Sequence, residues 1–184
     1  MPKVLIPLAQ GFEELEAVTV IDLLRRADIE VITAGLAPGP VTGSRLTVLV
    51  PDSTLDAELE RDFDMIVLPG GLPGADHLDA DPRIHALLRR HQTEDRFTAA
   101  ICAAPKILAG AGLLDGRSAT GYPGILDATT FPGVNLLDDA VVVDGKVVTS
   151  RGPGTAMDFA LRLIELLVDS ERRQRVEAAL VRPA

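Results

Sequence analysis

The sequence predicts an α/β fold in which helices cover a mainly parallel sheet, and three observations lead to this prediction. Short apolar runs alternate with helix-length segments along all 184 residues. Hydrophobic residues make up 47% of the chain but aromatic residues only 3%, so the core is aliphatic, as buried parallel strands usually are. The length fits one domain, at roughly 100–200 residues per domain, and we expect residues 1–184 to form it.

The expected strands end at turns or at small residues. Asp64–Leu68 leads into Pro69-Gly70-Gly71, and Phe97–Ile101 leads into Cys102. Val41–Val50 is typical of a hairpin or of two short edge strands. The remaining strands are expected over Lys3–Ala9, Ile29–Ala34, Ala140–Val143 and Lys146–Ser150. Asp144-Gly145 between the last two strands indicates a two-residue hairpin turn, so the sheet should have antiparallel edges.

The expected helices show apolar residues at helical spacing. Glu13–Ala27 carries a stripe formed by Ala17, Val20, Ile21 and Leu24. Further helices are expected over Pro82–His91, Ala103–Ala111, Gly154–Val168 and Glu171–Leu180. Because ligands of open α/β folds bind at the carboxyl ends of the strands, a site is expected near three segments, which are Pro69–Gly71, Cys102–Pro105 and Arg151–Thr155.

The charge and the apolar pattern exclude several classes of partner. The chain has 18 basic and 27 acidic residues, a net charge of −9, which argues against binding to nucleic acid or to an anionic membrane. No apolar run approaches the roughly 18 residues of a transmembrane helix. The N-terminal run lacks a signal-cleavage pattern and the chain has one cysteine, so we expect a reduced, cytoplasmic protein.

Cys102 is the residue best suited to chemistry, because it stands between an expected strand and an expected helix. Unpaired amides and the macrodipole at a helix N-terminus favour the thiolate, which is the nucleophilic form of cysteine. The alternative is that Cys102 is a small, inert core residue, as buried free cysteines often are.

The possible partners of this thiol are histidines or carboxylates. His85 and His91 lie among arginines and are expected to be solvated, while the role of His77 is open. Of the carboxylates in the first turn after Phe12, Glu13 aligns best with the apolar stripe and Glu16 lies at its edge. Both carboxylates also have a simpler explanation, since acidic residues in a first turn complement the helix dipole.

Backbone amides and arginines provide further candidates. The Gly70-Gly71 turn exposes N–H groups that, with the amide of Ala103, are suited to an oxyanion, although ordinary strand-ending turns look the same. Arg151–Thr155 opens the next helix and is suited either to an anion or simply to capping. The sequence shows no metal-ligand spacing and no phosphate-loop pattern.

Four stretches together resemble the ThiJ/PfpI superfamily, and within it the parkinsonism-associated deglycase subgroup with its bacterial relatives. They are Gly11-Phe12-Glu13-Glu14-Leu15-Glu16-Ala17-Val18, Val67-Leu68-Pro69-Gly70-Gly71, Ala100-Ile101-Cys102-Ala103-Ala104-Pro105 and Thr149-Ser150-Arg151-Gly152-Pro153-Gly154-Thr155. The resemblance implies a flavodoxin-like three-layer sandwich and a homodimer. It implies that Cys102 is the elbow cysteine, that Glu16 lies beside its sulfur, and that the amides of Gly71 and Ala103 form the oxyanion site. Arg45 and Arg151 match arginines near the pocket or the dimer interface.

The chain departs from this pattern at one position. Many members of the subgroup have a histidine where Tyr122 precedes Pro123 here, and other branches have one where Ala103 follows the cysteine. The absence of both argues against a Cys-His protease. A carboxyl with a raised pKa at Glu16 is suited to take over proton transfer, and the Tyr122 hydroxyl, a poor base at neutral pH, is suited to hold a substrate oxygen.

The sequence favours an enzyme that needs no cofactor or metal and acts on small reactive aldehydes. Such an enzyme converts methylglyoxal to a 2-hydroxy acid, as a glyoxalase III does, or removes early glycation adducts from proteins. The alternative is an oxidative-stress sensor or chaperone-like protein that acts through oxidation of Cys102, which requires only a reactive thiol. A third possibility is a domain that has lost its activity, since Tyr122 replaces the usual histidine.

Overall fold

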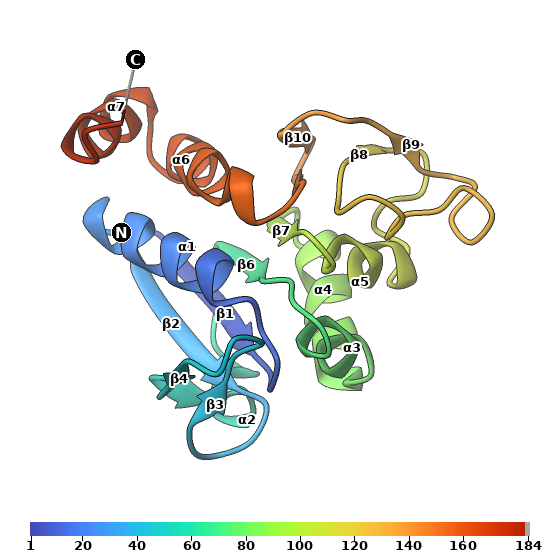
Figure 1. Cartoon of the computed structure of the whole chain (residues 1–184), viewed down its shortest axis with the longest axis horizontal. Coiled ribbons are helices and arrows are strands. Elements are labelled where there is room, and N and C mark those ends of the chain that lie inside the picture. The colour runs from blue at the N-terminus through green and yellow to red at the C-terminus, as the bar shows by residue number, and fades with distance from the viewer. Residues whose placement is uncertain (183–184) are drawn as a thin grey trace.

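A computed structural model describes residues 1–182 and has a seven-stranded sheet at its centre (Figure 1). The strand order is β10-β11-β7-β6-β1-β2-β5. All neighbouring strands are parallel except the β10–β11 hairpin at one edge. The strands are β1 Lys3–Leu8, β2 Glu30–Gly35, β5 Ser53–Thr54, β6 Met65–Leu68, β7 Phe97–Ile101, β10 Val141–Asp144 and β11 Val147–Ser150. The expected, mainly parallel sheet is confirmed.

Helices form the two outer layers (Figure 1). They are α1 Glu14–Arg26, α2 Leu55–Glu58, α3 Gly74–Asp79, α4 Pro82–Thr93, α5 Pro105–Gly110, α6 Ala156–Leu167 and α7 Ser170–Ala179, with a 3₁₀ turn, η1, at Pro153–Thr155. Helix α6 packs between α1 and α7, whereas α3 packs against α4 and α5. The three-layer, flavodoxin-like sandwich is therefore confirmed. No helix within residues 1–182 is long and apolar enough to span a bilayer.

Several local details differ from the sequence prediction. The expected hairpin over Val41–Val50 forms from β3 Val41–Thr42 and β4 Val48–Leu49, but it makes a separate two-stranded sheet. A third small sheet, of β8 Ser118–Ala119 and β9 Asn135–Leu136, was not predicted, because two-residue strands are too short to show a period. In the last hairpin Asp144 still belongs to β10, so the turn is Gly145-Lys146.

The strand order determines where a ligand can bind. Strand β1 pairs with β2 on one side and with β6 on the other, so the direction of chain progression reverses between β1 and β6. Open α/β sheets bind ligands outside the carboxyl ends of the strands at such a switch point. The buried strand β6 and the strand β7, which is buried except at Phe97, both end there, and they are followed by Pro69–Gly71 and by Cys102.

Candidate active site

Cys102 occupies a sharp turn at the end of β7. Its φ angle is +63°, a left-handed conformation that costs a non-glycine residue about 1–2 kcal/mol. Two hydrogen bonds hold this conformation: the Cys102 N–H donates to the Ser150 carbonyl (3.0 Å), and the Cys102 carbonyl accepts from the Tyr122 N–H (2.8 Å). The helix that follows begins only at Pro105, because the turn uses the residues before it.

Glu16 lies beside the thiol. It projects from the first turn of α1 into the interior and is fully buried. Its Oε2 accepts a hydrogen bond from the Gly70 N–H (2.8 Å), and its carboxyl is close enough to Cys102 for each group to shift the pKa of the other. Burial raises the pKa of Glu16 to about 7, and the charge of Glu13 adds to the rise, while the bonds to Cys102 and Gly70 oppose it. The raised pKa expected for this carboxyl is therefore found.

The thiol itself is less acidic than its position in the sequence indicated. Cys102 is only 9% exposed, and burial together with the Glu16 carboxylate raises its pKa to about 12. The Ala103 and Gly71 amides lower this pKa, but they do not outweigh burial. The start of the helix was expected to favour the thiolate, whereas burial and the neighbouring carboxyl oppose it. Cys102 and Glu16 therefore form a coupled pair, in which the Glu16 carboxylate lies where it can accept the thiol proton.

Two glycines make room for this pair. A Cβ atom added to Gly70 would lie 2.7 Å from Glu16 Oε2 and 2.8 Å from Cys102 Cβ. Gly71 has a φ angle of +87°, and its added Cβ would lie 2.4 Å from the Glu13 nitrogen. The amides of Gly71 and Ala103 both lower the pKa of Cys102, so each favours negative charge on the sulfur. Glycine at positions 70 and 71 allows the backbone to approach Glu16, Cys102 and Glu13 this closely.

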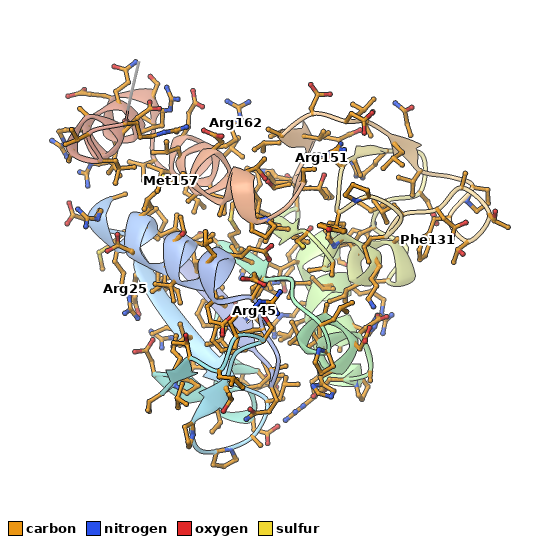
Figure 2. The ribbon with its side chains drawn as sticks, viewed as in Figure 1. Arg25, Arg45, Phe131, Arg151, Met157 and Arg162 are labelled. Atoms are coloured by element: carbon orange, nitrogen blue, oxygen red, sulfur yellow. The ribbon has the colours of Figure 1, made fainter. Side chains whose placement is uncertain are left out.

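The other candidates lie further from the sulfur. Tyr122 donates its backbone N–H to the Cys102 carbonyl, but its side chain is 53% exposed. Arg151 directly follows β11 and pairs with Asp138 (2.6 Å), and Arg45 lies exposed on the loop between β3 and β4 (Figure 2). The structure thus brings together Cys102, Glu16, Gly70, Gly71 and Ala103. Tyr122 contacts Cys102 through its backbone, whereas Arg45 and Arg151 make no hydrogen bond to Cys102 or Glu16 within the described chain.

The histidines require one correction. His91 is fully buried on α4, with Nδ1 3.2 Å from the Leu87 carbonyl oxygen, so the expectation of a solvated side chain is wrong. It faces the core because it shares a helix face with Ile84, Leu87 and Leu88. His85 lies beside Asp79, and His77 Nδ1 lies 2.9 Å from the Gln10 carbonyl oxygen. Among the hydrogen bonds of residues 1–182, none joins a histidine to Cys102.

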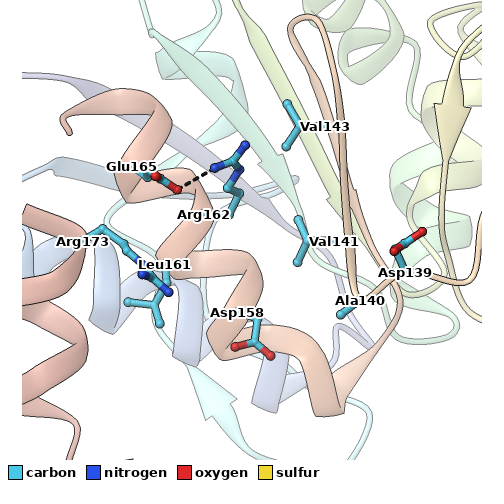
Figure 3. Close-up of a pocket in the computed structure, with 9 residues that line it drawn as sticks. All are labelled: Asp139, Ala140, Val141, Val143, Asp158, Leu161, Arg162, Glu165 and Arg173. Atoms are coloured by element: carbon cyan, nitrogen blue, oxygen red, sulfur yellow. Dashed lines mark hydrogen bonds and ion pairs between the residues drawn. The ribbon is translucent and has the colours of Figure 1, made fainter. Parts of the chain in front are cut away.

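A separate hollow lies between β10 and α6 (Figure 3). Its volume is about 600 Å³, and its walls include Val141, Val143 and Leu161. The charged groups beside it are mostly paired, as Arg162 is with Glu165 (2.6 Å). Within residues 1–182 no three His, Cys, Asp or Glu side chains gather as metal ligands. The candidate residues from the sequence therefore gather at Cys102 and not at this hollow.

Sequence reasoning missed the role of the loop between β3 and β4. Ser44 Oγ donates to Glu13 Oε2 (3.1 Å), and the Glu13 N–H donates to the Gly70 carbonyl (3.0 Å). This loop therefore joins the wall of the site through Glu13. No local sequence signal marks the contact, because 31 residues separate Ser44 from Glu13.

This combination of fold and site defines a known class of protein. Residues 2–166 match the DJ-1/PfpI family, and the chain belongs to this family. The protein dj-1beta of Drosophila melanogaster is 41% identical over 178 residues, which cover 96% of this chain and 95% of that protein. The glutathione-independent glyoxalase DJR-1.2 of Caenorhabditis elegans is 36% identical over 169 residues, which cover 92% of this chain and 89% of that protein.

Other relatives are longer. Protein DJ-1 homolog A of Arabidopsis thaliana is 39% identical over 181 residues, and the match covers 97% of this chain but 46% of that protein. Among solved structures, Drosophila DJ-1beta has a TM-score of 0.94 at 39% identity, covering 100% of this chain and 99% of that one. Oxidized Toxoplasma gondii DJ-1 has a TM-score of 0.92 at 36% identity and covers all of both chains.

Proposed function

We propose that this protein is a cofactor-independent enzyme that acts on small reactive aldehydes such as methylglyoxal and glyoxal. The observation that carries the proposal is the burial of Cys102 and Glu16 side by side against Gly70, where the Gly71 and Ala103 amides favour negative charge on the sulfur. A nucleophile beside a base with a pKa near 7, next to two N–H donors, is suited to addition to a carbonyl. The name of the C. elegans relative, a glutathione-independent glyoxalase, supports the same chemistry.

In the first step the Cys102 sulfur bonds to the aldehyde carbon of methylglyoxal. The thiol proton passes to the Glu16 carboxylate as the carbonyl π bond breaks and its electron pair moves to the oxygen. The Gly71 and Ala103 amides hold that oxyanion. Glu16 then returns its proton to the oxygen, which gives a neutral hemithioacetal and a carboxylate ready for the next step.

In the second step Glu16 removes the hydrogen from the former aldehyde carbon as a proton and delivers it to the neighbouring carbon, while the hemithioacetal hydroxyl proton passes to the oxygen of that neighbouring carbon. The product is a thioester of a 2-hydroxy acid, and the oxidation of one carbon balances the reduction of the other. Water cleaves the thioester to release lactate and restore the thiol. The Tyr122 hydroxyl is suited to hold a substrate oxygen during these steps, in the role left open by the missing histidine. Protein deglycation would begin with the same attack by Cys102.

The test is lactate formation from methylglyoxal by the purified wild type and its Cys102→Ser variant. Sustained lactate production by the wild type alone supports the proposal. If neither protein forms lactate, the aldehyde reaction is excluded for this substrate, and oxidation of Cys102 or an inactive domain remains.

The second candidate is an oxidative-stress sensor or chaperone-like protein. The solved Toxoplasma relative is described as oxidized, and a protonated Glu16 is suited to donate a hydrogen bond to an oxidised Cys102. One peroxide molecule would convert the thiol to a sulfenic acid and water, and a second would give the sulfinic acid. Intact mass after peroxide treatment should rise by two oxygen atoms in the wild type, and an equal rise in Cys102→Ser would exclude this role.

We also propose that the protein pairs with a second copy of itself. Large apolar side chains stand exposed on the outer face of α1 and on the neighbouring β3–β4 hairpin, namely Leu15, Val18, Leu46, Val48 and Val50. Leu46 is 81% exposed and Val50 is 76% exposed. Such a cluster is typical of a protein–protein interface, and the family resemblance implies a homodimer.

A further inference from the structure

The carboxylate of Glu14 holds the loop between β3 and β4. Its Oε1 accepts hydrogen bonds from the Arg45 N–H (2.7 Å) and the Thr47 N–H (3.2 Å), and its Oε2 accepts from Ser44 Oγ (3.2 Å). Burial opposes ionisation, but these hydrogen bonds lower the pKa of Glu14 below its ordinary value. At neutral pH the group is therefore the charged acceptor that such bonds favour.

The same loop is built around this carboxylate. A Cβ atom added to Gly43 would lie 2.3 Å from Glu14 Oε1, so glycine leaves room for the carboxylate to sit against the backbone. The Ser44 N–H donates to the Phe12 carbonyl (2.8 Å), which ties the loop to the segment before α1. Gly43 is not among the residues with positive φ, and its backbone conformation is open to alanine.

The loop reaches the Cys102 site through a short chain of contacts. Ser44 Oγ contacts Glu13 as well as Glu14, and the Glu13 N–H is bonded to the Gly70 carbonyl. Gly70 in turn donates to the Glu16 carboxyl that contacts Cys102. Segment 43–47 is thus joined to the Cys102 site through one intervening residue, Glu13.

We propose that Glu14 is a positioning residue that holds segment 43–47 at the mouth of the Cys102 site, so that Ser44 and Arg45 present a fixed surface to the incoming substrate. Glu14 contacts the loop and not the thiol, so it acts on binding and access and leaves the chemical steps to Cys102 and Glu16. The effect on substrate rests on the proposed aldehyde function, whereas the effect on the loop and on thiol access does not.

Two variants break the contacts between Glu14 and segment 43–47 by different routes. Glu14→Ala deletes the acceptor, and Gly43→Ala displaces the carboxylate with a methyl group while keeping Glu14. Glu14→Gln retains an acceptor oxygen for the Arg45 and Thr47 amides. Asp22→Asn is the matched control, because Asp22 is an exposed acid on the same helix that pairs with Arg26 (2.8 Å).

Hydrogen–deuterium exchange across residues 43–50 measures directly whether Glu14 protects the amides of this loop. The amides of Arg45 and Thr47 should exchange about tenfold faster or more in Glu14→Ala and Gly43→Ala, as expected when a protecting hydrogen bond is lost. Exchange in Glu14→Gln and Asp22→Asn should stay near that of the wild type. Unchanged exchange in both disrupting variants would overturn the proposal.

Kinetics distinguish positioning from catalysis. With methylglyoxal, the disrupting variants should raise KM by roughly three- to tenfold and leave kcat within about twofold, and Glu14→Gln should restore KM. A fall in kcat at unchanged KM would overturn the proposal, because it would place Glu14 in the chemistry.

Thiol access separates this proposal from the aldehyde function. If the wild type makes no lactate, alkylation of Cys102 by a bulky maleimide should still be faster in Glu14→Ala and Gly43→Ala than in the wild type and Asp22→Asn. That result would retain the positioning role and reject the aldehyde enzyme. Equal alkylation rates in all four proteins would reject the positioning role as well.

Discussion

At the scale of single residues, the Cys102–Glu16 pair sets the chemistry, because each group changes the proton affinity of the other. Burial disfavours both the Cys102 thiolate and the Glu16 carboxylate, and near neutral pH the two groups together hold one proton. The pair therefore titrates as a unit, with Glu16 as the group that changes charge around pH 7.

The rate of aldehyde turnover should follow this titration. Because ionised Glu16 accepts the thiol proton, kcat/KM should rise as the pH increases through about 7. The Glu16→Gln variant should be roughly 10²–10⁴-fold less active, and its pH profile should lack the inflection. The measurement is initial lactate rate from pH 5.5 to 8.5, with circular dichroism to verify the fold of the variant. A flat wild-type profile across this range would exclude Glu16 as the base.

His91 makes the fold sensitive to acid. Burial, aided by the charges of Arg90 and Arg96, lowers the pKa of His91 to about 4. The unfolded chain, with a histidine pKa near 6.5, binds more protons between these values, so the free energy of unfolding should fall as the pH drops from 6.5 to 4. The loss should be on the order of 2–3 kcal/mol.

Urea unfolding at pH 7.5 and pH 5 checks this prediction. His91→Leu removes the titrating group, so its unfolding free energy should fall less between the two pH values than that of the wild type. His85→Leu, on the same helix, serves as the control. If the unfolding free energies of the wild type and His91→Leu fall equally between the two pH values, His91 is not the source of the acid sensitivity.

At the scale of elements, the junction after β6 supports the site as much as the elbow after β7. Gly70→Ala would place a methyl group against both Glu16 and Cys102. Crowding of this kind costs about 1–3 kcal/mol, and we expect activity to fall further because the pair must separate. Melting temperature and lactate rate measure the two effects. Gly154→Ala is the control, since no heavy atom lies within 4 Å of its added Cβ.

At the scale of the whole molecule, we propose that the exposed apolar cluster on α1 and the β3–β4 hairpin forms the interface between two copies. Val48→Lys combined with Val50→Lys should then shift the protein from dimer to monomer in sedimentation velocity, because charge replaces apolar surface at the interface. Val181→Lys changes a valine that is still more exposed, near the C-terminal end of the chain, and should leave the assembly intact. A monomeric wild type at micromolar concentration would contradict the proposal.

The architecture followed largely from the sequence. The β6 and β7 runs and the α1 stripe were each recognisable from composition and period, since buried parallel strands and amphipathic helices have distinct patterns. The turn at Cys102 was also visible, because small residues flank it on both sides. Strands β8 and β9 were not visible, because the pairing of two distant two-residue segments decides them. The start of α5 was not visible either, because the turn at Cys102 decides it.

The sequence by itself determined the fold class and the position of Cys102 at the end of a buried strand. Periodicity favoured Glu13 and the family resemblance implied Glu16, and the tertiary structure gave the physical reason for Glu16, since the packing of α1 on the sheet buries its side chain. It likewise placed His91 in the core and raised the pKa of Cys102. The physical reason is common to all three: a residue's proton affinity and burial depend on neighbours that are distant in the chain.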